Sequence, residues 1–469
     1  MKNLHQTIFL KLLFFSILLT SCKNQPFQEN DFTAHFGGVI DNPSSQYVIL
    51  FKDNIAIDSI LLDENNHFFK KYDSLAPGMY TFKNEPEYQH IYFEKNDSLM
   101  ISFNAKNFDE SLVFGGRGDL KNNFLIDLYL KNEQDRANLF QYYDKEHKTF
   151  RPLLDSIYKD KKNFYNSRKE TINWSEDFDI YAKALINYNH YVRLELYPYI
   201  YFKRTGTDIS KNLPKDYYGF RGLVDLNDEK LISFQPFTSY LTAMLNNMVY
   251  EHCLNNGHNT DLALHCNIEK LKQTNELFKS EKIKNTILNN IAFMYLLEDQ
   301  NLASNQTFLN EYFKYSTDKS THNEISKISK NAQALKPNTL FPDEILTDVD
   351  GNKKSLRSLI NKPTVIYFWS TKSISHLESA HKKVEDYTKK YPNVKFISIN
   401  IDDDFISWKK SLSQYNFNKD LEFHNTNYKN SKDKWVITKI HRTIILNPDG
   451  TIKNAFANLF DSDFDSNLK

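Results

Sequence analysis

Thiol chemistry in this chain depends on three cysteines, Cys22, Cys253 and Cys266. Two of them follow histidines, and the pairs His252-Cys253 and His265-Cys266 flank a segment that contains the turn-forming residues NNGHNTD. In an oxidising compartment, this spacing across a helix hairpin predicts a structural disulfide rather than a zinc site. Two free buried thiols are the remaining alternative. Because the spacing differs from Cys-x-x-Cys, it does not indicate a redox-active pair.

No cysteine lies in the last 200 residues, and this limits the chemistry of the segment PTVIYFWSTKSISH, from Pro363 to His376. Its apolar first half predicts a buried strand, which runs into a helix near Ser373. Disulfide exchange needs a thiolate and a second thiol that resolves the mixed disulfide. Ser373 offers a hydroxyl, which is a poor nucleophile unless a base activates it. The sequence therefore excludes a dithiol mechanism built from this C-terminal region alone.

The first 22 residues carry the pattern of a secretory signal. Lys2 and Lys11 accompany the apolar run LLFFSILL, and the chain then reaches the sequence LTSC, which ends at Cys22. The apolar run is too short to span a bilayer stably. Its end resembles a bacterial lipobox, in which the chain is cut before the cysteine and the cysteine carries the lipid. We therefore expect residues 1–22 to be a lipoprotein signal and Cys22 to be lipidated; an ordinary cleaved signal and an uncleaved anchor are the alternatives.

The resemblance to lipoproteins also predicts a location. Lys23 follows the cysteine, and the absence of Asp at this position favours the outer over the inner membrane. We expect a lipid-anchored protein of the cell envelope, on the outer membrane and facing the periplasm. The 59 basic and 59 acidic side chains balance, so the charge does not indicate nucleic-acid binding. The expected partners are the membrane, through the lipid, and a protein or peptide.

Composition and hydrophobic patterning predict a multidomain α+β protein. A chain of 469 residues, 40% of them hydrophobic, is long enough for several cores. In residues 31–118, short runs such as QYVILF and SLMISFN alternate with turn residues, which predicts a β-sandwich-like domain. In residues 119–336 the hydrophobic period becomes helical, which predicts an all-α domain interrupted at Pro214, Pro236 and Gly257. We expect its Tyr and Phe residues mainly in the core, rather than in a ligand-binding groove.

Residues 337–469 show the pattern of an α/β domain. The segment LKPNTLFPD carries two prolines and ends the preceding helices. A strand at 363–369 is followed by a helix from Ile374, the strand VKFISINID and a second helix. A β-hairpin with the turn NPDG comes last. A β-α-β-α unit followed by such a hairpin is the arrangement of the thioredoxin fold.

This last domain resembles the TlpA-type family of envelope disulfide reductases. The residues that carry the resemblance are the DGN at 350–352, Phe368-Trp369 at the strand end, the strand VKFISINID and the NPDG at 447–450. The order of strands and turns in residues 31–118 is also similar to the small β-domain that precedes thioredoxin-like domains in many envelope lipoproteins.

Alignment through Phe368-Trp369 places the two active-site cysteines of the family at Ser373 and His376. The family's cis-proline, which clamps substrate peptides beside the active site, falls at His441, or at Arg442 after a slip of one residue. Both hallmarks of a disulfide reductase are therefore replaced in this chain, and its active site is degenerate.

Two hypotheses describe what replaced the dithiol. In the first, Ser375 is the N-cap of the helix, and the side chain of Glu378 accepts a hydrogen bond from the backbone N–H of Ser375. This Ser-x-x-Glu capping box would stabilise the helix start and would have no reactivity. In the second, His376 and His441 face each other across the old active-site groove, joined by Ser373 or by a metal. Two histidines and a hydroxyl form a weak metal site, and no carboxylate is placed to orient them. We favour the capping box, and we expect no cofactor or metal.

We therefore expect a non-redox binding or scaffold module rather than an active disulfide reductase. A groove formed by Trp369, Ser373, His376 and His441 is expected to hold an extended peptide or a partner surface. The competing hypothesis is a thiol-disulfide oxidoreductase of the TlpA type. That activity would require Cys253 and Cys266 to serve as the thiol pair.

Overall fold

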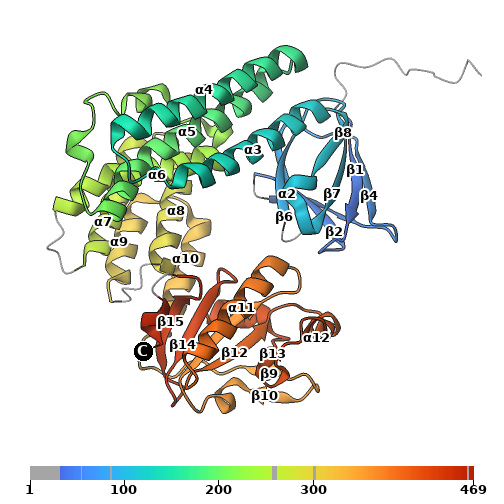
Figure 1. Cartoon of the computed structure of the whole chain (residues 1–469), viewed down its shortest axis with the longest axis vertical. Helices are drawn as coiled ribbons and strands as arrows, with labels where there is room; N and C mark the ends of the chain where they lie inside the picture. The colour runs from blue at the N-terminus through green and yellow to red at the C-terminus, as the bar shows by residue number, and fades with distance from the viewer. Residues whose placement is uncertain are drawn as a thin grey trace, which may run out of the picture.

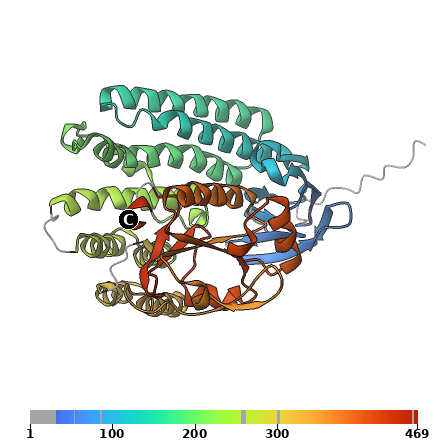
Figure 2. The same ribbon diagram turned by 60° about the horizontal axis from the view of Figure 1, so that its bottom comes forward.

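The computed structural model of the chain describes residues 32–53, 55–84, 87–255, 261–298, 303–461 and 464–468. The predicted signal with Cys22, and the predicted interruption at Gly257, lie outside the described residues. Figures 1 and 2 show a β-rich part, a group of long helices and an α/β part, in chain order. The predicted α+β fold class is confirmed. Within the described residues, no helix combines the length and the apolar character needed to cross a membrane.

The N-terminal part contains two four-stranded sheets, ordered β4-β1-β7-β8 and β3-β2-β5-β6. Apolar side chains on alternate strand positions face each other between the sheets, where the rings of Phe36 and Phe82 lie 5.9 Å apart. The segment Val113–Arg117 forms strand β8 and pairs antiparallel with β7. The elements are β1 (Ala34–Asp41), β2 (Tyr47–Lys52), β3 (Ile55–Leu61), β4 (His67–Tyr72), β5 (Gly78–Asn84), β6 (Glu87–Phe93), β7 (Ser98–Asn104), α2 (Phe108–Ser111) and β8.

The middle part consists of helices whose aromatic residues pack together. The ring of Phe150 stacks on Tyr197 at 4.3 Å, and the ring of Tyr188 on Tyr240 at 5.4 Å. All four lie in one buried cluster, as expected for core residues. The helices are α3 (Asp119–Phe140), α4 (His147–Ile172), α5 (Glu176–Thr205), α6 (Gln235–Asn255), α7 (Leu262–Leu277), α8 (Glu281–Glu298), α9 (Asn305–Tyr315) and α10 (Lys319–Gln333).

Proline is not always a helix breaker in this part of the chain. Pro214 lies in the irregular segment between α5 and α6, as predicted. Pro236 instead is the second residue of α6, where the first helical turn needs no N–H donor from it. Pro198 lies well inside α5, which continues through it to Thr205.

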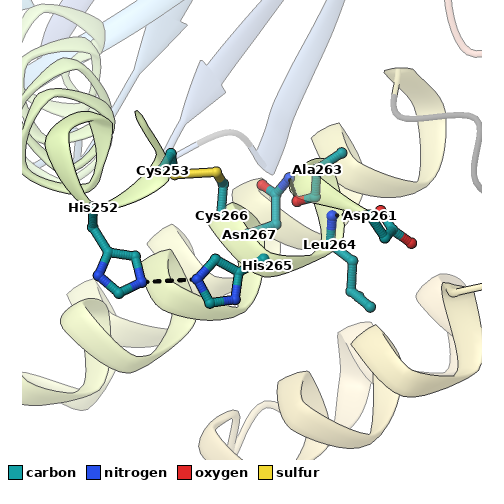
Figure 3. The surroundings of a disulfide bond; sticks show 8 residues. All are labelled: His252, Cys253, Asp261, Ala263, Leu264, His265, Cys266 and Asn267. Atoms are coloured by element: carbon teal, nitrogen blue, oxygen red, sulfur yellow. Dashed lines mark hydrogen bonds between the residues drawn. A yellow bond between two sulfur atoms is a disulfide. The ribbon is translucent and has the colours of Figure 1, made fainter. Parts of the chain in front are cut away.

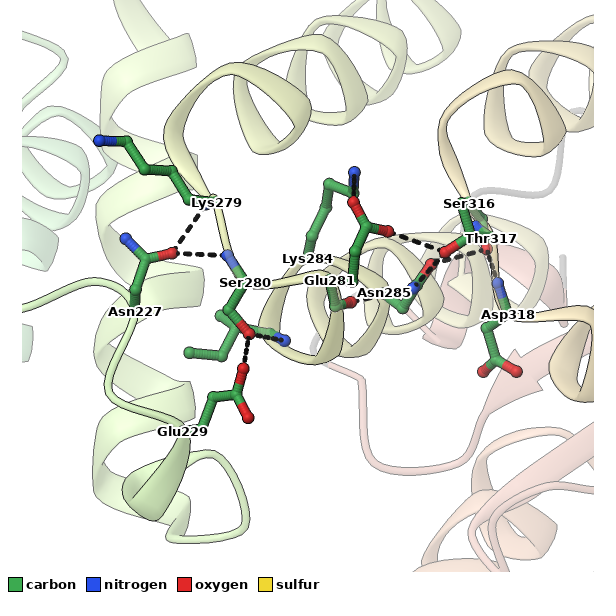
Figure 4. A network of polar contacts seen from close by, with 11 residues as sticks. Asn227, Glu229, Lys279, Ser280, Glu281, Lys284, Asn285, Ser316, Thr317 and Asp318 are labelled. Carbon is green, nitrogen blue, oxygen red and sulfur yellow. Dashed lines mark hydrogen bonds and ion pairs between the residues drawn. The ribbon is translucent and has the colours of Figure 1, made fainter.

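Polar side chains fix the turns around α8 and α10 (Figure 4). Asn227 Oδ1 accepts a hydrogen bond of 2.9 Å from the backbone N–H of Ser280, immediately before α8. Asn285 Oδ1, on α8, accepts one of 2.9 Å from the N–H of Thr317, before α10. Asp318 is the N-cap of α10, and its side chain accepts bonds from two N–H groups of the first turn. These contacts satisfy backbone donors that have no partner within the helices themselves.

A disulfide joins α6 to α7 (Figure 3). It links Cys253 to Cys266, whose Cα atoms lie 5.6 Å apart. The neighbouring histidines also meet, because Nε2 of His252 lies 2.9 Å from Nε2 of His265. One of these nitrogens must donate a hydrogen and the other accept it, so the contact requires that at least one ring be neutral.

The C-terminal part is built on a seven-stranded sheet ordered β10-β9-β13-β12-β11-β14-β15. β11 is parallel to β12, and β14 pairs antiparallel with β11. All six residues of β11 are buried, which accounts for the continuous apolar run in the sequence. The elements are β9 (Ile345–Thr347), β10 (Lys353–Ser355), η5 (Leu356–Leu359), β11 (Thr364–Trp369), α11 (Ile374–Lys390), β12 (Lys395–Asn400), α12 (Phe405–Gln414), β13 (Glu422–His424), α13 (Tyr428–Lys434), β14 (Arg442–Leu446) and β15 (Ile452–Asn458).

The helical part is packed against both of its neighbours. Asn122 of α3 receives a hydrogen bond of 2.7 Å from the backbone N–H of Tyr92 in β6 and donates one of 2.9 Å to its carbonyl. At the other end, Ala332 of α10 and the following Leu335 are buried in the same cluster as Ile366 of β11. The helices therefore share packed contacts with the N-terminal sheets and with the C-terminal sheet.

Replacing both Cys253 and Cys266 with serine is expected to lower the free energy of unfolding of the helical part by about 3 kcal/mol, because the bond closes a loop with a sequence separation of 13 residues. Urea denaturation followed by far-UV circular dichroism measures this loss. Reduced wild-type protein is the matched control and should lose the same amount. Unchanged denaturation midpoints in both samples would contradict the prediction.

Candidate functional site

Ser373 and His376 lie at the first turn of α11, directly after the buried strand β11. Ser373 is the N-cap residue, and its side chain makes no capping hydrogen bond within the described part of the chain. The predicted capping box with Ser375 as the N-cap is wrong. The N-cap is Ser373, two residues earlier, and the helix begins at Ile374, because the N–H of Leu377 already bonds to the carbonyl of Ser373 at 2.9 Å. Ser375 is therefore the second helical residue.

Asp402 holds the loop that leads from β11 to α11. Its carboxylate accepts hydrogen bonds from the hydroxyl of Ser370, from the N–H of Thr371 at 2.6 Å and from the Thr371 hydroxyl at 2.7 Å. Asn400 at the end of β12 adds a bond of 3.1 Å from its side-chain amide. The carboxylate is buried, so each of these bonds is protected from water. Because β11 and β12 are neighbouring parallel strands, their carboxyl ends bring these groups together.

His376 is half-buried, and one of its ring nitrogens is occupied. Nε2 lies 3.1 Å from the carbonyl oxygen of Phe368. A carbonyl can only accept, so Nε2 must carry the hydrogen and donate it. Burial is the largest cause that lowers the pKa of His376; the Phe368 carbonyl opposes it, and the nearby His441 adds to it. In the described residues no hydrogen bond joins Ser373 to His376, so the two are not arranged as a nucleophile and its base.

Trp369 does not line a groove, and that prediction is wrong. Its side chain is fully buried, and the ring N–H donates a hydrogen bond of 3.2 Å to Glu422 Oε2. Glu422 Oε1 lies 3.2 Å from Nε2 of His381, and Nδ1 of the same ring donates to the carbonyl of Leu377 at 2.7 Å. Since Nδ1 carries a hydrogen, a proton must also lie between Nε2 and the carboxyl group. The side chain of Trp369 thus anchors α11 to the sheet through Glu422.

His441 immediately precedes β14 and is half-buried, close enough to His376 for their charges to interact. The ring of Phe460 lies 5.6 Å from the ring of His376 on the same side of the domain. Arg442, the alternative position for the cis-proline, is buried as the first residue of β14. The described residues contain no group of three or more His, Cys, Asp or Glu side chains that could hold a metal ion.

The disulfide lies apart from this site. It joins the adjoining ends of α6 and α7, whereas Ser373 lies at the start of α11. In Figure 1, α6 and α7 lie among the helices of the middle part, whereas α11 packs on the C-terminal sheet. The structure therefore brings His376 and His441 together near the start of α11, whereas it places Cys253 and Cys266 on α6 and α7.

Three residues that organise the site, Asp402, Glu422 and His381, were not predicted from the sequence. Asp402 had a usable signal, since it follows the strand VKFISIN and parallel strands end at a common edge. Glu422 had none, because β13 is only three residues long and lies in a polar segment. His381 lies two turns into α11, where a histidine has no distinctive spacing.

Replacing Glu422 with alanine is expected to lower the free energy of unfolding of the C-terminal part by about 3 kcal/mol, because the N–H of Trp369 and the ring of His381 lose their buried partner. Urea denaturation measures the change. Glu385→Ala is the matched control: that carboxylate pairs with Lys389 on the exposed surface of α11, where water screens the ion pair, so its loss should leave the free energy of unfolding nearly unchanged. Equal losses in the two variants would contradict this role for Glu422.

Comparison with known proteins gives a family match in this region alone. Residues 361–452 match the family of thioredoxin-like proteins. Among solved structures, a protein of Bacteroides vulgatus assigned as a thiol-disulfide oxidoreductase is 26% identical, with a TM-score of 0.26, and covers 29% of this chain and 96% of its own. A thioredoxin-like protein from Bacteroides caccae is 16% identical, with a TM-score of 0.34, and covers 59% of this chain and 92% of its own. No curated protein matches the sequence.

The family match covers β11, α11 and β14, and it includes Ser373, His376 and His441 at or next to these elements. The parallel pair β11 and β12, with β14 and β15 added antiparallel, is the arrangement expected of that fold. The C-terminal part of this chain is a thioredoxin-like domain.

Proposed function

We propose that the protein is a lipid-anchored envelope protein whose thioredoxin-like domain binds a peptide or protein partner without redox chemistry. The observation that carries the proposal is the replacement of both thiol positions at the start of α11 by Ser373 and His376. A hydroxyl and an imidazole cannot form the sulfur bond that disulfide exchange requires.

The geometry around these positions supports binding rather than catalysis. Asp402 fixes the loop at Ser370 and Thr371, and the carbonyl of Phe368 fixes the ring of His376. Groups that are held in place before binding lose little entropy when a ligand arrives. The half-buried His376 and His441 supply polar contacts, and the partly exposed Phe460 supplies an apolar one. An extended peptide, which offers backbone polar groups and side chains, is a ligand of suitable chemistry.

A redox role for the disulfide is the competing function, and the structure gives it little support. Cys253 and Cys266 lie on α6 and α7, and the bond between them closes a helix hairpin. A structural bond in that position explains the pair without catalysis.

The absence of thiols at α11 can be tested by restoring them. Wild-type protein is expected to show no turnover of an insulin-type disulfide substrate with dithiothreitol as the reductant. The variant Ser373→Cys/His376→Cys, made together with Cys253→Ser/Cys266→Ser, is expected to gain turnover, because the fold then presents two thiols one helical turn apart.

Turnover by the wild-type protein, or its absence in the variant with restored cysteines, would each contradict part of the proposal. Wild-type turnover that Cys253→Ser/Cys266→Ser abolishes would establish the redox function. A folded variant with restored cysteines and no turnover would contradict the assignment of Ser373 and His376 to the dithiol positions.

The lipid anchor rests on the resemblance of LTSC, ending at Cys22, to a lipobox. In a bacterial host, Cys22→Ala is expected to abolish incorporation of a labelled fatty acid and to shift the protein out of the membrane fraction. Cys253→Ser is the matched control and should keep both the label and the location. Retention of the label in Cys22→Ala would contradict the anchor.

A further inference from the structure

Beside the site lies a buried cation, Arg442, which forms no ion pair with a carboxylate in the part of the chain that the structure describes. Arg442 is 7% exposed, and its Nε donates a hydrogen bond of 3.0 Å to the carbonyl of Ala455. Its Nη2 is buried and makes no hydrogen bond in the described part of the chain. The guanidinium lies on the ring of Phe456, 3.9 Å from its centre. The side chain therefore uses one of its five N–H donors on the backbone and rests its flat face on an aromatic ring.

The charge of Arg442 is retained in spite of its burial. Burial lowers the pKa of Arg442 to about 9, which leaves the guanidinium protonated at neutral pH. No carboxylate among the described residues forms an ion pair with it. An unpaired buried charge is strongly destabilising, whereas an anion in contact with it offsets that cost. The structure thus holds a cation that lacks its counter-charge.

A cavity of about 350 Å³ adjoins this cation. It lies between the start of β14, the strand β15 and the end of α8, from which Leu297 contributes. The polar residues of its lining are Thr438, Lys439, His441, Arg442, Asn458 and Asp461.

Two cations, Lys439 and Arg442, face one carboxylate in this lining. That carboxylate, on Asp461, accepts a hydrogen bond of 2.9 Å from the side-chain amide of Asn458. The lining therefore has an excess of positive charge, with polar donors around it. His441 belongs both to this lining and to the site at the start of α11, so the cavity adjoins that site directly.

We propose that this cavity, here called the Arg442 pocket, binds a carboxylate of the peptide that occupies the site at the start of α11. The inference rests on the proposed peptide-binding function, and it adds the class of ligand: an acidic peptide. A planar carboxylate can take two parallel hydrogen bonds from a guanidinium, and the second cation, Lys439, adds to the attraction. A free oxyanion such as inorganic phosphate shares this chemistry, and the test separates the two sources.

Two matched fluorescent peptides test the proposal with the full mature chain. One carries glutamate at two positions and the other carries glutamine there, and fluorescence anisotropy measures both affinities. Wild-type protein is expected to bind the glutamate peptide about tenfold more tightly, and Arg442→Gln is expected to remove this preference. Arg357→Gln is the matched control, since this exposed arginine lies in η5, next to the opposite edge of the sheet, and the preference should persist.

A second variant keeps the test decisive if Arg442→Gln does not fold, which circular dichroism reveals. Lys439 is exposed at the rim, so Lys439→Met should fold and should reduce the preference for glutamate several-fold. Equal binding of both peptides by wild-type protein would overturn the Arg442 pocket as a carboxylate site while leaving peptide binding intact.

Two further outcomes would each contradict a different part of the proposal. Binding of neither peptide, together with Arg442-dependent binding of inorganic phosphate, would show a site for a free anion and overturn the peptide carboxylate. Disulfide turnover by the wild-type protein would instead remove the proposed function itself, and this result is independent of the peptide measurements.

Discussion

The buried carboxylate of Asp402 is the constraint on which the region at the start of α11 depends. It receives hydrogen bonds from the loop at Ser370 and Thr371 and from Asn400 on the neighbouring strand, so one side chain ties the end of β11 to the end of β12. In a thioredoxin-like domain with cysteines, this loop would have to permit a reaction at sulfur. Here the loop is held by several bonds to one buried anion, an arrangement suited to a fixed binding surface.

A second buried carboxylate, Glu422, holds α11 against the sheet. It accepts from the ring N–H of Trp369 and bonds the ring of His381, which connects the strand end to α11. The ring of His381 stacks on Phe417 at 3.7 Å, so its orientation is fixed on a second side. Polar groups that are fully paired in a core favour a single arrangement of the elements that carry them. The first turn of α11 thus keeps its position without a disulfide at its start.

The sequence predicted the elements whose local pattern is strong. The apolar run 363–369 became β11 at 364–369, the helix began at Ile374, and the final hairpin formed as expected. The strand β13 and the short helix α13 were missed, because the segment that contains them is polar and β13 forms through pairing with β12 and β9. The capping motif placed the N-cap of α11 at Ser375, whereas the N-cap residue is Ser373. Contacts with residues distant in sequence determine where these elements form, and the local sequence pattern does not reveal such contacts.

The site itself was predictable only in part. The family resemblance pointed to Ser373, His376 and His441, and the structure brings the two histidines close enough for their charges to interact. It did not reveal that Trp369 faces inward, because a strand buried on both faces shows no alternation that would mark its direction. The buried Arg442 had no signal either, since the burial of a cation next to a cavity depends on β15 and on the end of α8.

The shared packing of α10 with the C-terminal sheet has a consequence for how the molecule meets its surroundings. Ala332 and Leu335 are buried with Ile366, and Asn122 locks α3 to the backbone of β6, so the helices act as a rigid spacer between the two outer parts. A surface on the last part then keeps a set height and direction relative to the first strand. A ligand bound there is therefore held at a set distance from β1.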